Sequence, residues 1–156
     1  MIGIDIPGFG PVRLAHLVCD FTGTLSRDGI LLEGVAEKIR EISRHLAVYV
    51  LTTDMCGTAR SELAGLPCSI HIVFGTGIDI RKEEFVRELG PEQVVAIGNG
   101  CNDRRMLKTA RLGIAVSGSE GCSTDALMAS DVHVCRVIDA FDLLLKPKRC
   151  KATLRF

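Results

Sequence analysis

Residues 16–26 read HLVCDFTGTLS, and this stretch decides the fold class that we predict. Its first half is an apolar run that ends at Asp20, and the segment FTGT that follows turns the chain. A strand buried on both faces of a parallel sheet has such a continuous apolar sequence, and ligands bind at the carboxyl ends of these strands. Asp20 is therefore predicted to lie where a doubly wound sheet binds its ligand. An aspartate here is equally well explained as a turn residue, so the prediction depends on the segments that follow.

Downstream of this stretch, short apolar runs alternate with amphipathic segments. The apolar runs predict strands at residues 47–51, 69–74, 93–97, 112–116 and 132–135. Charged and apolar residues at helical spacing predict helices at residues 33–44, 58–66, 79–89, 104–110, 122–129 and 138–145. This alternation is typical of an α/β domain with a mostly parallel, doubly wound sheet, helices on both faces and right-handed crossovers. We predict one such domain for residues 1–156.

The two ends of the chain lie outside this alternation. Residues 2–14 predict an N-terminal β-hairpin, because two short apolar segments flank the turn sequence PGFG. The apolar side of that hairpin is either an interface for another chain or a cover for the edge of the sheet. Residues 146–156 form a basic tail that we expect to lie across an edge or an end of the sheet.

Composition limits the kinds of partner that we expect. Lysine plus arginine and aspartate plus glutamate both number 19, so no net charge favours binding to nucleic acid or to a membrane surface. No apolar run is long enough for a membrane span, and the first residues lack the pattern of a signal peptide, so the cytoplasm is the expected location. The seven cysteines form no C-x-x-C pair and several fall in apolar runs, so we expect buried thiols rather than zinc ligands or disulfides.

Four polar segments fall where the predicted strands end or on a helix that leads into a strand. They are DFTGT at residues 20–24, TTD at 52–54, KEEFVREL at 82–89 and GNGCND at 98–103. Each has an ordinary structural explanation. Lys82 can be a solvated helix charge, with Arg81 as its rival, and Asp103 can cap the helix that follows it. Together, they point to one site at the carboxyl edge of the sheet.

The four segments resemble the motifs of the haloacid dehalogenase superfamily, and within it those of the phosphorylation domain of P-type ATPases. The ATPase motifs D-K-T-G-T, T-G-D, K-x-x-I-V-x-x-L and G-D-G-x-N-D correspond in order to the four segments, and the resemblance covers residues 14–134. The chain looks most like the small soluble P-type-ATPase-like proteins of that superfamily. The resemblance implies a Rossmannoid domain without a cap, and a Mg²⁺-dependent phosphohydrolase or phosphotransferase that acts through an aspartyl-phosphate.

The resemblance also implies roles for individual residues. Asp20 is the expected nucleophile, and Lys82 is expected to offset negative charge on it and on the transferring phosphoryl group. The residues implied in catalysis are Asp20, Thr22, Thr52 and Lys82. Those implied in phosphate binding are Phe21 and Gly23, through their main-chain amides, and Thr52, Thr53 and Lys82. The ligands implied for Mg²⁺ are Asp20, the main-chain carbonyl of Thr22, Asn99 and Asp103.

Three positions depart from the superfamily pattern. Thr22 stands, as in the ATPases, where most phosphatases of the superfamily have an acid–base aspartate, a group that typically speeds a reaction by about 10²–10⁴-fold. We therefore expect a preference for good leaving groups and a longer-lived phosphoenzyme. Asn99 replaces a metal-binding aspartate and removes one negative charge. Phe21 replaces the lysine of the ATPases, so the role of that lysine is absent.

The spacing between the four segments is too short for a cap domain, so an open site is expected. An open site favours a phosphorylated small molecule or a phosphoprotein as substrate, with a second copy of the chain as a candidate lid. The alternative function is a regulatory module that binds phosphoryl groups and Mg²⁺, hydrolyses slowly or not at all, and acts on a protein partner. A two-component receiver domain ranks lower, since its phosphorylated aspartate follows the third strand.

Overall fold

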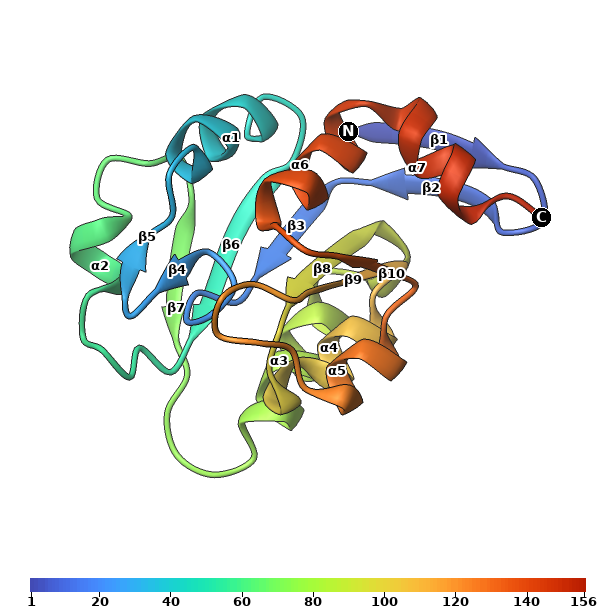
Figure 1. Cartoon of the computed structure of the whole chain (residues 1–156). Coiled ribbons are helices and arrows are strands. Elements are labelled where there is room, and N and C mark those ends of the chain that lie inside the picture. The colour runs from blue at the N-terminus through green and yellow to red at the C-terminus, as the bar shows by residue number, and fades with distance from the viewer.

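A computed structural model describes residues 1–156, and its centre is a six-stranded parallel sheet (Figure 1). From one edge to the other, the strands are β10 (Val132–Val134), β9 (Leu112–Val116), β8 (Val94–Gly98), β3 (His16–Cys19), β6 (Ala47–Thr52) and β7 (Ser69–Ile72). All neighbouring strands run parallel. The predicted α/β fold with a parallel sheet is confirmed, and each strand lies close to its predicted position.

The order of the strands places Asp20 where the chain changes direction across the sheet. After β3, at the centre, the chain builds β6 and β7 on one side and then returns to build β8, β9 and β10 on the other. β3 therefore pairs with β6 on one side and with β8 on the other. Where the strand order reverses, the loops after neighbouring strands run to opposite sides of the sheet and leave room between them for a ligand. All residues of β8 and β9 are buried, as apolar strands between two layers of helices should be.

Helices cover both faces of the sheet (Figure 1). One face carries α1 (Val35–Ile42) and α6 (Val137–Leu145), and the other carries α3 (Ile78–Glu88), α4 (Arg104–Thr109) and α5 (Thr124–Ala129). The helix predicted at residues 58–66 is much shorter, α2 (Ala59–Glu62), and the chain turns at Gly65, which adopts a left-handed φ of 72°. Every helix is too short or too polar to cross a lipid bilayer.

The N-terminal hairpin is present, and its apolar side is covered by the chain itself. Strands β1 (Ile2–Ile6) and β2 (Gly10–Leu14) pair antiparallel, and alternate residues of β1 are buried in the main core. Of the two alternatives, the structure therefore supports a cover rather than an interface. The basic tail, which we expected to lie across an edge or an end of the sheet, forms helix α7 (Pro147–Leu154), which packs on β1 of the hairpin (Figure 1). The Phe156 amide then donates to the Pro7 carbonyl at 3.2 Å.

A second, very small hairpin follows the Asp20 loop, where the sequence indicated only a turn. Its strands are β4 (Ser26–Arg27) and β5 (Ile30–Leu31), joined through Asp28, which has a left-handed φ of 52°. No cap domain is inserted here or after β7, as predicted. The suggestion that a second copy covers the site stays a prediction.

Asp142 on α6 ties three helices together. Its carboxylate oxygens lie 2.9 Å from Lys38 Nζ of α1 and 2.7 Å from Lys146 Nζ, and Arg149 Nη1 of α7 lies 3.1 Å away. Hydrogen bonds from Lys146 and Lys38 lower the pKa of Asp142 to about 2. A carboxylate with a depressed pKa stabilises the fold above its unfolded pKa, and the contribution is lost as the pH falls through the folded pKa.

We expect Asp142→Asn to lower the free energy of unfolding by about 1–2 kcal/mol at neutral pH, because the side chain is mostly buried among three cations. The loss should shrink as the pH falls from about 4 toward about 2, where the wild-type carboxylate is protonated too. Urea unfolding across this range measures it. Asp139→Asn is the matched control, since its ion pair with Arg136 is exposed to solvent and should contribute little to stability. A loss that does not change with pH would argue against this assignment.

Candidate active site

Lys82 and two aspartates form a buried ionic cluster at the carboxyl end of β3. Lys82 projects from α3, and its Nζ lies 2.7 Å from Asp20 Oδ1 and 2.7 Å from Asp103 Oδ1. Lys82 and Asp103 are completely buried, whereas Asp20, also buried, keeps 8% of its side chain exposed. The alternative that Lys82 is a solvated helix charge is therefore wrong. Its rival Arg81 donates instead to the Thr76 carbonyl on the surface.

Burial and charge shift the pKa values within this cluster. Burial, with the nearby charge of Asp103, raises the pKa of Asp20 to about 6, although Lys82 opposes the rise. Burial would lower the pKa of Lys82, but the two carboxylates outweigh it and raise that pKa above its usual value. Lys82 is thus held as an ammonium ion. Two ionised carboxylates around one ammonium leave an excess of negative charge, which attracts a cation.

Asp103 fastens the loop that follows β8. Its Oδ2 accepts hydrogen bonds from the amides of Asn99 at 3.0 Å and Gly100 at 2.9 Å, while Oδ1 pairs with Lys82. A Cβ at Gly98 would lie 2.6 Å from the carboxyl carbon of Asp103, so a glycine is needed there. Asp103 precedes α4 but makes no capping hydrogen bond to it. Because both of its oxygens already serve the chain, direct coordination of Mg²⁺ by Asp103 stays a prediction.

Thr24, a turn threonine expected only to offer its hydroxyl or amide to an anion, and not included among the predicted site residues, joins two oxygens of the site. Its hydroxyl lies 3.3 Å from Asp20 Oδ2 and 3.1 Å from Asn99 Oδ1. A hydroxyl has one hydrogen to donate, so it satisfies only one of these oxygens at a time. Asn99 is held in this orientation because its Nδ2 donates to the Gly121 carbonyl at 3.1 Å. Position in the DFTGT segment was the only sequence signal for Thr24.

These oxygens suit a hard divalent cation. Mg²⁺ prefers oxygen ligands, usually with one or two carboxylates among them, and here a carboxylate oxygen of Asp20 and the amide oxygen of Asn99 converge on one hydroxyl. With the main-chain carbonyl of Thr22, the donor set fits the ion that the sequence resemblance implies. No group of three or more His, Cys, Asp or Glu side chains is placed to hold a metal ion by itself.

The threonines predicted to bind phosphate are the last residue of β6, the strand beside β3, and the residue that follows it. Thr52 ends β6, is fully buried, and accepts a hydrogen bond on its hydroxyl from the Asp54 amide at 2.9 Å. Asp54 has a left-handed φ of 51°, and its carboxylate accepts hydrogen bonds from two amides at the start of α2. Thr53, between them, is half-buried. Asp54 thus fixes the loop and orients Thr52.

The turn after Asp20 is folded around Phe21. The Phe21 side chain is fully buried, and its carbonyl accepts hydrogen bonds from three amides further along the turn. A hydrogen bond from the Phe21 amide to the Asp20 carboxylate opposes the rise of the pKa of Asp20. The Gly23 amide, predicted to bind phosphate, already donates to the Ser26 carbonyl at 3.1 Å. Core packing explains the apolar residue at position 21, where a charge would lose its hydration.

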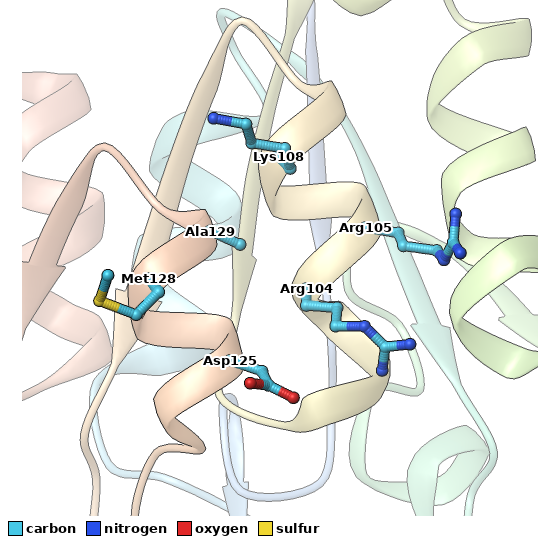
Figure 2. A pocket seen from close by; sticks show the side chains of 6 residues that line it. All are labelled: Arg104, Arg105, Lys108, Asp125, Met128 and Ala129. Carbon is cyan, nitrogen blue, oxygen red and sulfur yellow. The ribbon is translucent and has the colours of Figure 1, made fainter.

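Two hollows in the surface involve elements that also carry site residues. The one in Figure 2, of about 430 Å³, lies between α4 and α5, and none of the predicted site residues lines it. Its Arg104 and Arg105 each lie 2.9 Å from Asp79, which neutralises part of the positive charge. The other hollow, of about 420 Å³, borders Thr24 and has apolar residues of α6 in its wall.

Comparison with known proteins gives two kinds of relative, while no protein-family model matches the chain. The chain is 47% identical over 73 residues to an uncharacterized protein of Methanocaldococcus jannaschii. The alignment covers 47% of this chain and 78% of that protein, so the two proteins belong to one family. It is 29% identical over 121 residues to the probable phospholipid-transporting ATPase IM of Homo sapiens. That alignment covers 74% of this chain and 10% of the ATPase, so the chain spans only a tenth of that relative.

Two solved structures share the fold. The cobalt-bound deoxy-D-mannose-octulosonate 8-phosphate phosphatase of Haemophilus influenzae superposes with a TM-score of 0.71 at 15% identity, over 86% of this chain and 88% of that one. The 3-deoxy-D-manno-octulosonate 8-phosphate phosphatase of Moraxella catarrhalis, in complex with magnesium, phosphate and a KDO molecule, gives 0.66 at 17% identity, over 85% and 86%. Because most of both chains superposes, the shared fold is one without a cap domain.

Proposed function

We propose that this chain, which belongs to the haloacid dehalogenase superfamily by its fold and is distantly homologous to the catalytic region of P-type ATPases, is a Mg²⁺-dependent phosphohydrolase or phosphotransferase. The strongest support is the buried Lys82 between the carboxylates of Asp20 and Asp103. Of the two carboxylates, Asp103 is enclosed by hydrogen bonds from the chain, whereas Asp20 is partly exposed at the ligand-binding edge of the sheet. Asp20 Oδ2, whose contact with the Thr24 hydroxyl is long at 3.3 Å, is the oxygen that we propose to react.

In the proposed reaction, a carboxylate oxygen of Asp20 bonds to phosphorus while the bond from phosphorus to the leaving-group oxygen breaks, and the leaving group takes the electron pair. Water then attacks the phosphorus, which regenerates the Asp20 carboxylate and releases phosphate. Lys82 stabilises the negative charge on the phosphoryl oxygens through both steps. Bound Mg²⁺, for which Asp20, Asn99 and the Thr22 carbonyl are the proposed ligands, supplies further neutralisation of that charge.

The proposed preference for substrates with good leaving groups follows from the lack of an acid positioned to protonate the leaving group. The Thr22 hydroxyl is buried without a hydrogen-bond partner, and an alcohol is a far weaker acid than the carboxyl group that would protonate a leaving group. A leaving group must then depart as a stable anion. We therefore propose acyl phosphates, aryl phosphates or nucleoside triphosphates, or a phosphoprotein with a comparable bond. The hollow beside Thr24 leaves space for the attached group.

Phosphate release from acetyl phosphate, p-nitrophenyl phosphate, ATP and a hexose phosphate tests the proposal, with Asp20→Asn as the matched variant. We expect release that needs both Mg²⁺ and Asp20, at least about 10²-fold faster with the good leaving groups than with the hexose phosphate. Equal rates on all substrates would show that Thr22 does not limit the reaction. A cooperative thermal unfolding transition is the control that shows whether the Asp20→Asn variant is folded.

A phosphoryl-binding regulatory module is the second candidate, favoured by the neutral amide of Asn99 among the proposed metal ligands. An amide oxygen binds Mg²⁺ more weakly than a carboxylate does, which slows chemistry that depends on the ion. If neither wild type nor Asp20→Asn releases phosphate from any of the four substrates, this candidate replaces the enzyme.

A further inference from the structure

The loop between β9 and α5 brings a carboxylate to the Asn99 side of the site. Glu120 lies in this loop, which is closed by a bridge between Gly118 and Gly121. Two hydrogen bonds fasten the loop to the segment after β8. Asn99 Nδ2 donates to the Gly121 carbonyl at 3.1 Å, and the Ser123 amide donates to the Asn99 carbonyl at 2.8 Å. Glu120 is therefore carried on a backbone that is fixed relative to Asn99.

The two carboxylate oxygens of Glu120 have different surroundings. Oε1 accepts a hydrogen bond of 2.7 Å from the amide of Asp28, at the turn between β4 and β5. Oε2 faces Gly23, since a Cβ on that glycine would lie 3.0 Å from Glu120 Oε2 and 2.5 Å from Asn99 Nδ2. The carboxylate of Glu120 and the amide of Asn99 are thus neighbours across Gly23. The bond to Asp28 holds Glu120 in this orientation.

The charges around the Asp20 and Asn99 oxygens make such a carboxylate useful. Asn99 is neutral. The Lys82 ammonium lies 2.7 Å from both buried carboxylates, and its single positive charge balances only one of them. The ionised cluster therefore presents an excess of one negative charge, which is less than the charge of a divalent cation. Glu120 is the carboxylate that the loops hold next to Asn99, and it carries no ion pair with lysine or arginine.

We propose that Glu120 is a positioning residue for the cation: its charge replaces the one that asparagine at position 99 does not supply, and it strengthens Mg²⁺ binding. This role rests on the Mg²⁺ site of the proposed function and adds a residue to it. Mg²⁺ keeps several water ligands in protein sites, and carboxylates that act through such waters or through other ligands tune metal affinity. Glu120 thereby links the β4–β5 hairpin, the β9–α5 loop and the metal ligands.

Isothermal titration of Mg²⁺ into the full chain, without substrate, tests this role. Glu120→Gln removes the charge but keeps an oxygen that accepts the Asp28 hydrogen bond. We expect the dissociation constant for Mg²⁺ to rise about 10-fold, at the lower end of the range for residues that support metal ligands. Glu92→Gln is the matched control, because it removes the same charge from an exposed side chain just before β8, at the opposite end of that strand. It should leave the affinity unchanged.

The double variant Asn99→Asp/Glu120→Gln distinguishes the charge from a merely structural role. If Glu120 supplies the missing charge, aspartate at position 99 restores the affinity to at least the wild-type value. Wild-type affinity in Glu120→Gln, or a loss that Asn99→Asp does not rescue, would overturn the inference and leave the proposed function standing. If the wild type itself binds no Mg²⁺, the metal requirement of the proposed function fails with it.

Discussion

Lys82→Met is expected to lower the free energy of unfolding by about 3–5 kcal/mol at neutral pH. Methionine keeps much of the length of the side chain but lacks the ammonium group that lies 2.7 Å from both Asp20 and Asp103. Two buried carboxylates then face each other without a cation, and an uncompensated buried charge is strongly destabilising. Phosphate release should also fall by at least about 10²-fold, since the cation that stabilises the phosphoryl charge is gone. Urea unfolding and the phosphate assay measure the two effects.

The pH dependence of Lys82→Met identifies the cause of the loss. Without the ammonium group, the pKa of Asp20 rises further, so the folded variant holds a proton that the unfolded chain has released. The variant therefore gains stability relative to wild type as the pH falls toward about 6, below which wild-type Asp20 binds the same proton and the gain stops. Arg81→Met is the matched control on the exposed side of α3 and should change stability by less than about 0.5 kcal/mol. Equal losses in the two variants would rule out the buried ionic cluster.

Gly23→Ala has the second large expected effect. Gly23 has a φ of 78°, a left-handed conformation that costs a residue with a Cβ about 1–2 kcal/mol. The added Cβ would also lie 2.5 Å from Asn99 Nδ2, which is held by the Gly121 carbonyl. We expect the free energy of unfolding to fall by about 2–4 kcal/mol, because steric overlap adds to the backbone strain. Displacement of Asn99 should weaken Mg²⁺ binding by more than about 10-fold.

Gly65→Ala separates the steric overlap from the backbone strain. Gly65 has a nearly equal φ of 72°, but no atom lies within 4 Å of the Cβ that alanine would add. This variant should lose only the backbone contribution, about 1–2 kcal/mol, and keep wild-type affinity for Mg²⁺. If Gly23→Ala behaves in the same way, the close packing of Asn99 on the Asp20 loop is not part of the metal site.

The sheet explains why much of the fold and the centre of the site could be predicted from sequence. β3 and β6 are continuous apolar runs that pair in parallel, so the residues at their carboxyl ends, Asp20 and Thr52, necessarily lie near one another. Lys82 was found through its place in a motif, and only the structure shows that it is buried. Asp103 was found in the same way, but its hydrogen bonds to the loop after β8 were not predictable from the motif.

Contacts between distant loops were beyond the reach of sequence reasoning. Thr24 meets Asn99 across 75 positions, and Glu120 meets Asp28 across 92, so no local pattern marks either pair. Helix α7 was missed for a related reason. Only Cys150 on it is buried, and the helix is stabilised by packing on the hairpin and on α6 rather than by its own apolar stripe.

Phosphorylation of Asp20 is tested most directly by identifying the modified residue. The protein is incubated with acetyl phosphate and Mg²⁺, quenched in acid, digested and analysed by mass spectrometry. We predict one phosphoryl group on the peptide that contains Asp20, removed by hydroxylamine as an acyl phosphate should be, and absent from Asp20→Asn. Mg²⁺-dependent phosphate release without that modified peptide, or a phosphoryl group on a different residue, would contradict the assignment of Asp20 as the nucleophile.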